Sequence, residues 1–109
     1  MAASVTYLYA IGSSDGPIKF GISMNPWKRA TQIQTASPFK VALISACPCN
    51  SREEALLDEK WLHDYYAQKG KLLFGEWFDV SAVQAVEAVR DAVGFGNHFR
   101  GRAQAEGVS

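Results

Sequence analysis

The sequence predicts a single small α/β domain, because short runs of strand-forming residues alternate with segments of helical periodicity. The chain has 109 residues, of which 48% are hydrophobic and 12% aromatic, enough for one core and too few for two domains. Residues 5 to 11 are rich in β-branched and aromatic side chains, and a turn-forming run from Gly12 to Pro17 separates them from a second strand over residues 18 to 23. These two strands are predicted to form a hairpin.

A helix over residues 26 to 34 follows the hairpin. It starts at Asn25 and Pro26, because asparagine caps free backbone amides and proline is tolerated at the first helical position. Residues 39 to 46 predict a third strand bounded by prolines, the second of which is Pro48. The continuous apolar centre of this strand indicates that both of its faces are covered.

The longest predicted helix spans residues 52 to 68 and is opened by a capping box at Ser51. Glu59 and His63 lie four residues apart at the border of its apolar arc, so they stack on one surface. A carboxylate that faces apolar neighbours costs several kcal/mol unless it is paired or binds a metal ion. Asp58 also falls in this arc, so helical geometry alone does not choose between the two acids.

The end of the chain is predicted to contain a short extended closing segment over residues 75 to 80 and a final helix. Asp79 or Ser81 would cap this helix. The Gly-rich segment that follows the helix is typical of a flexible tail. The predicted divisions are therefore a domain over residues 1 to 93, its motif-bearing part over about residues 5 to 80, its extra helix over about residues 82 to 93, and a tail over residues 94 to 109.

The charge distribution limits the classes of molecule that the protein is expected to bind. The formal net charge is zero, which argues against a non-specific polycation that coats nucleic acid. Residues 1 to 50 carry a net charge of +3 and residues 51 to 80 a net charge of −3. This asymmetry suits a site that holds both an anionic substrate and a metal ion, and the plainer alternative is two solvated faces of opposite sign.

Two cysteines and the absence of targeting signals bear on the location of the protein. Cys47 and Cys49 are separated only by Pro48, too close for an ordinary disulfide, and a zinc site would need His63 and His98 as further ligands. We expect free structural thiols. No apolar run reaches membrane-spanning length and the first residues do not resemble a signal peptide, so we expect a cytoplasmic protein with no membrane partner.

The order and spacing of several short motifs resemble the GIY-YIG endonuclease superfamily. The motifs are Tyr-Leu-Tyr-Ala-Ile at residues 7 to 11, Lys19-Phe20-Gly21, Arg29 eight residues after that glycine, Leu-Leu-Asp-Glu at residues 56 to 59, and a closing Gly-Glu-Trp-Phe at residues 75 to 78. The chain is most similar to the branch with lysine in the second motif. The resemblance implies a small three-stranded antiparallel sheet flanked by helices, to which the C-terminal helix is an addition.

The resemblance also implies roles for individual residues. Catalytic roles fall on Tyr7, Tyr9, Lys19, Arg29, Glu59 and His63, and contacts to the substrate on Gly21, Lys28 and Arg29. Tyr9 is preferred over Tyr7 as the phenol of the first motif, with Tyr7 or His63 as substitutes. Glu59 would bind Mg²⁺ or Mn²⁺. Two departures are lysine in place of the second tyrosine and Glu76 where many members carry an asparagine near the domain end.

These residue types suit the hydrolysis of a phosphodiester, whose transition state carries more negative charge than its ground state. Arg29 would clamp two phosphate oxygens, and Glu59 would anchor a Mg²⁺ ion that keeps most of its waters. A tyrosine has an ordinary pKa of about 10, too high for a base at neutral pH, but an ammonium beside it favours the phenolate. Lys19 would supply that charge, and Tyr9 would take a proton from the attacking water. Gly21 would keep the strand surface clear for the substrate backbone.

The sequence therefore predicts a divalent-metal-dependent DNA endonuclease. One alternative is a catalytically inactive nucleic-acid-binding or adaptor module on the same fold, motivated by Lys19 and the missing asparagine. Another is a structural domain, in which the tyrosines pack within the sheet and the charged residues lie on the surface. Because no second domain is evident, recognition of DNA would come from a homodimer, a separate targeting partner, or the basic tail with Arg100 and Arg102.

Overall fold

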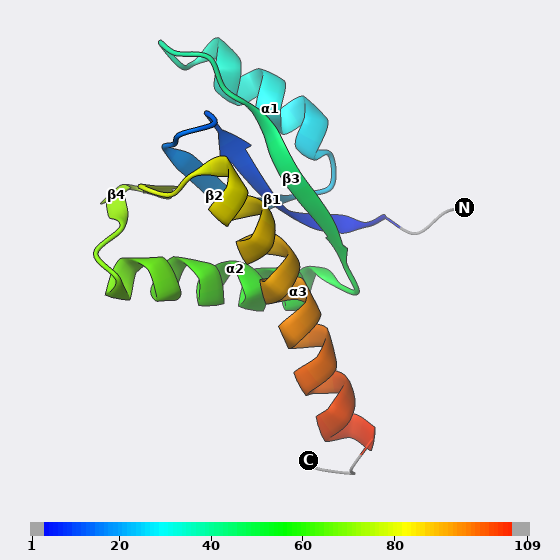
Figure 1. Cartoon of the computed structure of the whole chain (residues 1–109). Coiled ribbons are helices and arrows are strands. Elements are labelled where there is room, and N and C mark those ends of the chain that lie inside the picture. The colour runs from blue at the N-terminus through cyan, green and yellow to red at the C-terminus, as the bar shows by residue number, and fades with distance from the viewer. Residues whose placement is uncertain (1–3, 106–109) are drawn as a thin grey trace.

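The computed structural model describes the backbone of residues 4 to 105 and the side chains of residues 4 to 96. Within this range the chain forms five strands and three helices (Figure 1). In chain order they are β1 (Thr6–Gly12), β2 (Ile18–Ser23), α1 (Pro26–Thr35), β3 (Ala42–Cys49), α2 (Arg52–Gln68), β4 (Leu72–Phe74), β5 (Trp77–Phe78) and α3 (Ala82–Ala105).

The described strands form one antiparallel sheet in the order β3-β1-β2-β5-β4. The α/β class is confirmed, but the predicted number of three strands was wrong. The two additional strands form a hairpin of three and two residues, joined at Gly75, whose φ of 55° favours glycine. Strands this short carry no measurable alternation of apolar and polar residues, so the sequence showed only an extended segment.

Helix α1 lies on one side of the sheet and helices α2 and α3 on the other (Figure 1), and a core cluster of side chains lies on each side. Leu8 and Phe20 point to one face, where they pack with buried residues of α2 and α3. Tyr9 and Ile11 point to the other face, where they pack with Ala30 and other residues of α1. This arrangement follows from the alternation of side chains along a strand, and it leaves α1 alone on its side of the sheet.

The described helices begin at side-chain caps. Asn25 and Ser51 each accept a hydrogen bond from the amide three residues later, both at 3.1 Å, as the sequence predicted. Ser81 accepts the equivalent bond at 3.2 Å and therefore caps α3. The other candidate cap, Asp79, instead donates its backbone amide to the carbonyl of Lys71.

Strand β3 begins and ends later than the predicted residues 39 to 46. Pro48, expected to end the strand, lies within it. Proline is tolerated there because β3 is at the edge of the sheet, where a missing N–H does not interrupt pairing with a further strand. Helices α1 and α3 both contact β3, from opposite sides of the sheet, as the apolar centre of the strand predicted.

Helix α3 continues to Ala105, although the sequence predicted an end near Val93. Residues 94 to 105 are therefore helical and do not form a tail. A glycine that ends a helix commonly adopts a left-handed conformation, and Gly94 does not have a positive φ, so the helix continues through it. Residues 106 to 109 and the side chains of the predicted basic tail lie outside the described residues. No helix in the described part of the chain has the length and apolar character needed to cross a membrane.

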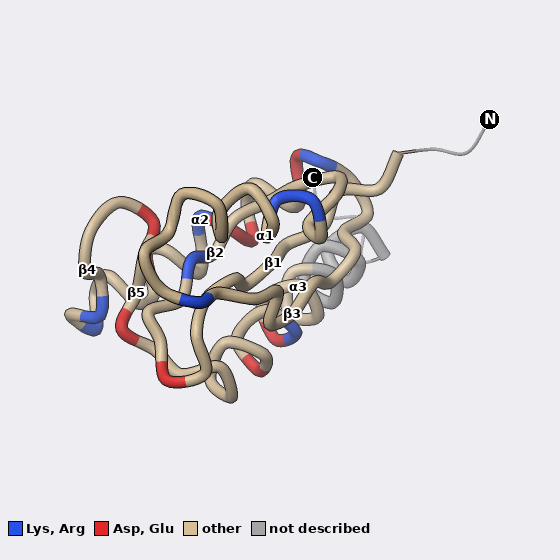
Figure 2. Tube along the Cα trace, turned by 90° about the horizontal axis from the view of Figure 1, so that it is seen from above, with Lys and Arg blue, Asp and Glu red and all other residues tan. Residues whose placement is uncertain are grey.

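Charged residues are distributed differently in space than along the chain. The sequence contrasts a basic first half with an acidic middle segment. Figure 2 shows that basic and acidic positions are interspersed over the described trace. The electrostatic character of a site must therefore be derived from its own residues.

Candidate functional site

Tyr9 lies on the face of the sheet that packs against α1, with its ring over Gly21 of the neighbouring strand. A Cβ atom on Gly21 would lie 2.5 Å from the Tyr9 Oη and 2.6 Å from its Cζ. The Tyr9 ring therefore occupies the space beside Gly21, and the contact of Gly21 with substrate stays a prediction. Glycine is required here for the ring to lie flat on β2.

The phenol oxygen of Tyr9 retains contact with solvent although the residue is 2% exposed. Every fully buried polar side-chain atom of the described residues has a hydrogen-bond partner. The Tyr9 phenol forms no hydrogen bond with the described residues, so its oxygen is not among those buried atoms. Among these residues the ring is held by packing, and its oxygen is not completely buried.

Tyr7 has different surroundings. It is half-buried and packs edge-on against Trp27, with 5.6 Å between the ring centroids. In the register of β1 and β2, Lys19 lies opposite Ile11. Tyr9 is therefore the diagonal neighbour of Lys19, and Tyr7 lies two residues farther along β1. Diagonal neighbours in a sheet are about 7–8 Å apart, so Tyr9 is the phenol nearer to the ammonium.

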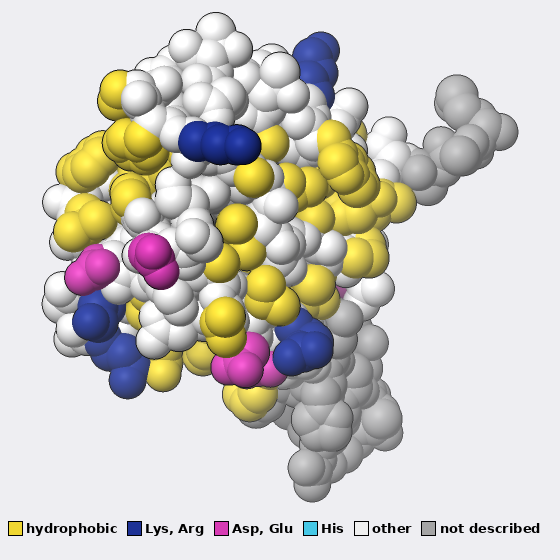
Figure 3. All heavy atoms as spheres, turned by 45° about the horizontal axis from the view of Figure 1, so that its top comes forward, with side chains coloured by type: hydrophobic (Ala, Val, Ile, Leu, Met, Phe, Trp, Pro, Cys, Tyr) yellow, Lys and Arg dark blue, Asp and Glu magenta, His cyan; other side chains and the backbone are white. Residues whose placement is uncertain are grey.

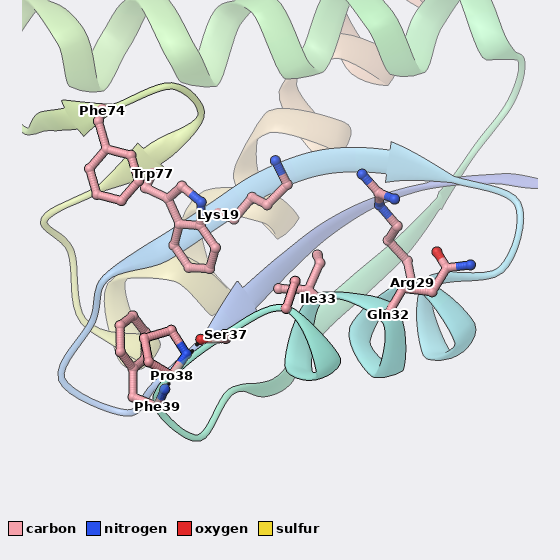
Figure 4. Close-up of a pocket in the computed structure, with 10 residues that line it drawn as sticks. Lys19, Arg29, Gln32, Ile33, Ser37, Pro38, Phe39, Phe74 and Trp77 are labelled. Atoms are coloured by element: carbon pink, nitrogen blue, oxygen red, sulfur yellow. Dashed lines mark hydrogen bonds between the residues drawn. The ribbon is translucent and has the colours of Figure 1, made fainter.

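A cleft of about 520 Å³ opens on the same face of the sheet, between β2, α1, the loop after α1 and the β4–β5 hairpin (Figure 4). Lys19 from the strand and Arg29 from the helix both line it, and Figure 4 shows both side chains pointing toward α2. The other lining residues are Gln32, Ile33, Ala36, Ser37, Pro38, Phe39, Phe74 and Trp77. Trp77 is half-buried in the wall of this cleft and packs against the core residues Tyr9, Ile11 and Val41.

Lys19 is held by an acid that sequence reasoning did not include among the site residues. Its Nζ donates to Glu76 Oε2 at 2.5 Å, with the two side chains 13% and 46% exposed. Glu76 precedes Trp77, which lies opposite Lys19 in the pairing of β2 with β5. In the sequence, Glu76 is visible only as an acid beside the short apolar segment Trp77–Phe78. The pairing of this segment with β2 is what identifies Lys19 as the partner of Glu76.

Arg29 is exposed and forms no ion pair with the described residues. Its guanidinium donors are therefore available to an anion. A second hollow of about 240 Å³ lies along α1 and includes Lys28, and both Arg29 and Gln32 line this hollow as well as the larger cleft. Helix α1 thus forms a ridge between two concave surfaces, with a free cation on it.

The two candidate acids of α2 lie in different environments. Asp58 is 4% exposed, and its Oδ2 accepts a hydrogen bond from Cys49 Sγ at 4.0 Å. Glu59 is half-buried, and its ionisation is affected by the charges of Glu76 and Lys19. Of the two acids, Glu59 is therefore the one whose charge interacts with the cleft residue Lys19, which helical geometry alone did not decide.

Glu59 has the properties of a carboxylate that a divalent cation would stabilise. Partial burial raises the pKa of Glu59 above its ordinary value; His63 and Lys19 oppose this shift, and Glu76 adds to it. Among the described residues, no group of three or more His, Cys, Asp and Glu side chains could hold a metal ion. Mg²⁺ usually takes only one or two protein carboxylates and keeps several waters, and Glu59 and Glu76 are two carboxylates whose charges interact.

His63 forms a structural contact that the sequence did not predict. Its Nε2 lies 3.0 Å from the carbonyl oxygen of Phe20, and its ring packs against Phe78 at 5.1 Å between centroids. Because a carbonyl only accepts, Nε2 carries the proton, and in the neutral ring Nδ1 is left with a lone pair. The pairing of β5 with β2 stops at Lys19, so His63 binds β2 just beyond the end of that pairing.

The cysteines do not contribute to this site. Both are free, as the sequence predicted. Burial raises the pKa of Cys49 to about 11, with the nearby charge of Asp58 acting in the same direction. The thiol is therefore protonated at neutral pH and a poor nucleophile or metal ligand.

These features define a small α/β domain with a partly cationic cleft beside its central strands. The chain belongs to the T5orf172 domain family, whose model matches residues 4–94. This match overturns the resemblance to the GIY-YIG superfamily, because T5orf172 is a distinct family and the motifs that carried the resemblance are short and individually weak. No curated protein and no solved structure matches the chain significantly.

T5orf172 is a nuclease-like, DNA-binding domain family. The chain therefore has a function related to nucleic acids, with DNA as the partner. This agrees with the coarser part of the sequence-based prediction and with the exposed cations Lys28 and Arg29 on α1.

Proposed function

We propose that the chain is a divalent-metal-dependent endonuclease that hydrolyses DNA phosphodiester bonds. One arrangement carries the proposal: Tyr9, Lys19 and Arg29 come from three elements to the same face of the sheet, and Glu59 of α2 is electrostatically coupled to Lys19. Membership of a nuclease-like, DNA-binding family supports DNA as the substrate.

Arg29 would bind the phosphate. Its exposed guanidinium has no internal ion pair and can donate two parallel hydrogen bonds to non-bridging oxygens. Lys28 in the adjoining hollow would contact the next phosphate along the strand. Fixed cations of this kind favour the transition state, because its charge on the phosphate oxygens exceeds that of the ground state.

Tyr9 would take the proton from the attacking water at its Oη, the atom that retains solvent contact. Lys19 is its diagonal neighbour and would favour the phenolate through its positive charge. The ion pair with Glu76 fixes the position of the ammonium and reduces its net effect. Tyr7 is farther from Lys19, and the Nδ1 lone pair of His63 is the second candidate for the base.

Glu59 would hold the metal ion, with Glu76 as a second carboxylate from the β4–β5 hairpin. When bound there, Mg²⁺ or Mn²⁺ would supply positive charge to the leaving oxygen of the phosphate. The raised pKa of Glu59 supports this role, since a nearby divalent cation offsets the cost of a partly buried carboxylate.

Nicking of supercoiled plasmid DNA with Mg²⁺ or Mn²⁺ tests the proposal. Arg29→Ala and Glu59→Gln should each slow cleavage by roughly 10²–10³-fold, the range found when one electrostatic contact to a transition state is removed. Arg90→Ala and Glu87→Gln are matched controls, because both residues are exposed on α3. Cleavage at the wild-type rate by folded Arg29→Ala and Glu59→Gln proteins would reject the proposal.

A second candidate function is DNA binding without cleavage. It is favoured by the Lys19–Glu76 ion pair, which occupies the ammonium that Tyr9 would need. This function predicts salt-sensitive binding to DNA and intact plasmid in every divalent metal ion. The same nicking assay, joined to a binding titration at several salt concentrations, separates the two functions.

A further inference from the structure

We infer that the cleft binds an unpaired nucleotide of a DNA strand, with the base against an aromatic wall and the phosphate at the cationic end. The aromatic wall consists of Phe39, Phe74 and Trp77. The inference rests on the proposed function and deepens it, because it names DNA with an unpaired base beside the bound phosphate as the substrate class.

The residues of the aromatic wall are placed at the surface. Phe39 is 45% and Phe74 63% exposed, whereas Phe20 and Phe78 of the same domain are almost completely buried. Phe74 and Trp77 stack with 29° between their ring planes and 6.5 Å between centroids. Solvent-facing rings around a concave surface are a platform on which a nucleobase stacks, since each base has a π-face.

The charges of the cleft match a nucleotide. Figure 4 shows the aromatic wall on one side, Arg29 on the other, and Lys19 between them. A base bound against the wall would therefore have its own phosphate directed toward Arg29. The volume of about 520 Å³ lies within the range of about 300–1,000 Å³ typical of small-ligand sites, so it has room for a nucleotide and not for a duplex.

An exposed aromatic pair on α2 lacks this match. Hydrophobic side chains gather in several patches on the face shown in Figure 3, so exposed apolar surface alone does not identify a nucleotide site. Trp61 and Tyr65 of α2 also stack on each other, but the hollow beside them is lined by Glu87 and Asp91, which would repel a phosphate. At the cleft, by contrast, exposed rings and the cations Lys19 and Arg29 line one concave surface.

A paired base cannot use the aromatic wall, because its faces are covered by its neighbours in the duplex. The strand must therefore present an extruded or single-stranded nucleotide, which costs unstacking energy in a regular duplex and little at a bulge or single-stranded junction. DNA that carries such a defect should bind more tightly than fully paired DNA of the same length and charge.

Binding of two short duplexes in EDTA tests this inference, one fully paired and one with a single unpaired 2-aminopurine. The wild type should prefer the second by roughly tenfold and quench its fluorescence, as stacking on an aromatic ring does. Phe39→Leu and Phe74→Leu should each reduce both the preference and the quenching. Phe95→Leu is the matched control, because this ring is 59% exposed and packs against Trp61 instead.

Equal affinity for the two duplexes, or a preference and quenching that survive both Phe39→Leu and Phe74→Leu, would overturn the inference. Because EDTA removes divalent metal ions, the result does not depend on cleavage. A wild type that nicks plasmid but binds both duplexes equally refutes the unpaired-nucleotide site alone. A wild type that prefers and quenches the unpaired base but never cleaves DNA refutes the endonuclease proposal alone.

Discussion

Replacement of Gly21 with alanine should disrupt the packing of Tyr9 on β2. The added Cβ would lie 2.5 Å from Oη, 2.6 Å from Cζ and 3.2 Å from Cε1 of the tyrosine. Ordinary carbon contacts begin near 3.5 Å, so the edge of the ring must move by roughly 1 Å. The ring is 2% exposed and packs with Ile11 and Val41, so it cannot move without disturbing this core.

The size of the effect follows from two opposing terms. Overpacking of a well-filled core costs about 1–3 kcal/mol, and replacing glycine by alanine within a strand returns about 0.5–1 kcal/mol of backbone entropy. A net loss of about 1 kcal/mol is expected, which lowers the melting temperature of a domain of this size by roughly 4–8 °C. A displacement of 1 Å at a catalytic group can reduce the rate by about 10²-fold. The rate of DNA cleavage should therefore fall even under conditions in which the variant is still fully folded.

Urea unfolding followed by circular dichroism measures the effect in a double-mutant cycle with Tyr9→Leu. Leucine lacks the outer ring atoms that the Cβ would contact, so Gly21→Ala should be nearly neutral in that background. Gly94→Ala is the control, since no heavy atom lies within 4 Å of its added Cβ and its φ is not positive. Within α3 this change should stabilise the protein by about 0.5–1 kcal/mol.

Two results would refute this reasoning. If Gly21→Ala destabilises the protein equally with and without the Tyr9 ring, the contact between them is not the cause. If the variant is destabilised as expected but cleaves DNA at the wild-type rate, the position of the phenol does not matter for catalysis.

Three further changes test the remaining parts of the site. Tyr9→Phe should leave the free energy of unfolding within about 0.5 kcal/mol of wild type, because the phenol oxygen has no hydrogen bond with the described residues. The same change should slow plasmid nicking by roughly 10²–10⁴-fold, because it removes the proposed base. A large loss of stability with unchanged nicking would contradict both expectations. Glu59→Gln should raise the melting temperature at neutral pH, because a folded-state pKa above the ordinary value of 4.5 makes the charged carboxylate destabilising as the pH rises through this range. That gain should vanish as the pH falls toward 4.5, and Mg²⁺ should raise the melting temperature of wild type only. Glu76→Gln should lower stability by at most about 1 kcal/mol, since the carboxylate is 46% exposed. It should also tighten DNA binding in EDTA, because Lys19 loses its ion pair and becomes available to phosphate. A salt titration of DNA binding measures this gain.

Features that depend on neighbours in the chain were predicted from the sequence. Asn25 and Ser51 cap helices by accepting hydrogen bonds from amides three residues later, so a few adjacent residues determine where each helix begins. The hairpin of β1 and β2 needs only its strands and a turn, and its second strand has the predicted bounds of residues 18 to 23. The α/β class follows from this local information.

Only the tertiary structure decided how the site is assembled. Glu76 meets Lys19 across 57 positions of sequence because a hairpin too short to be predicted pairs with β2. The same packing buries Asp58 beside Cys49. It also brings its neighbour Glu59 near enough to Lys19 for the lysine charge to affect the pKa of Glu59. Each residue was visible in the sequence, but its charge partner depends on which elements pack together, and that is set by the burial of apolar surface over the whole chain.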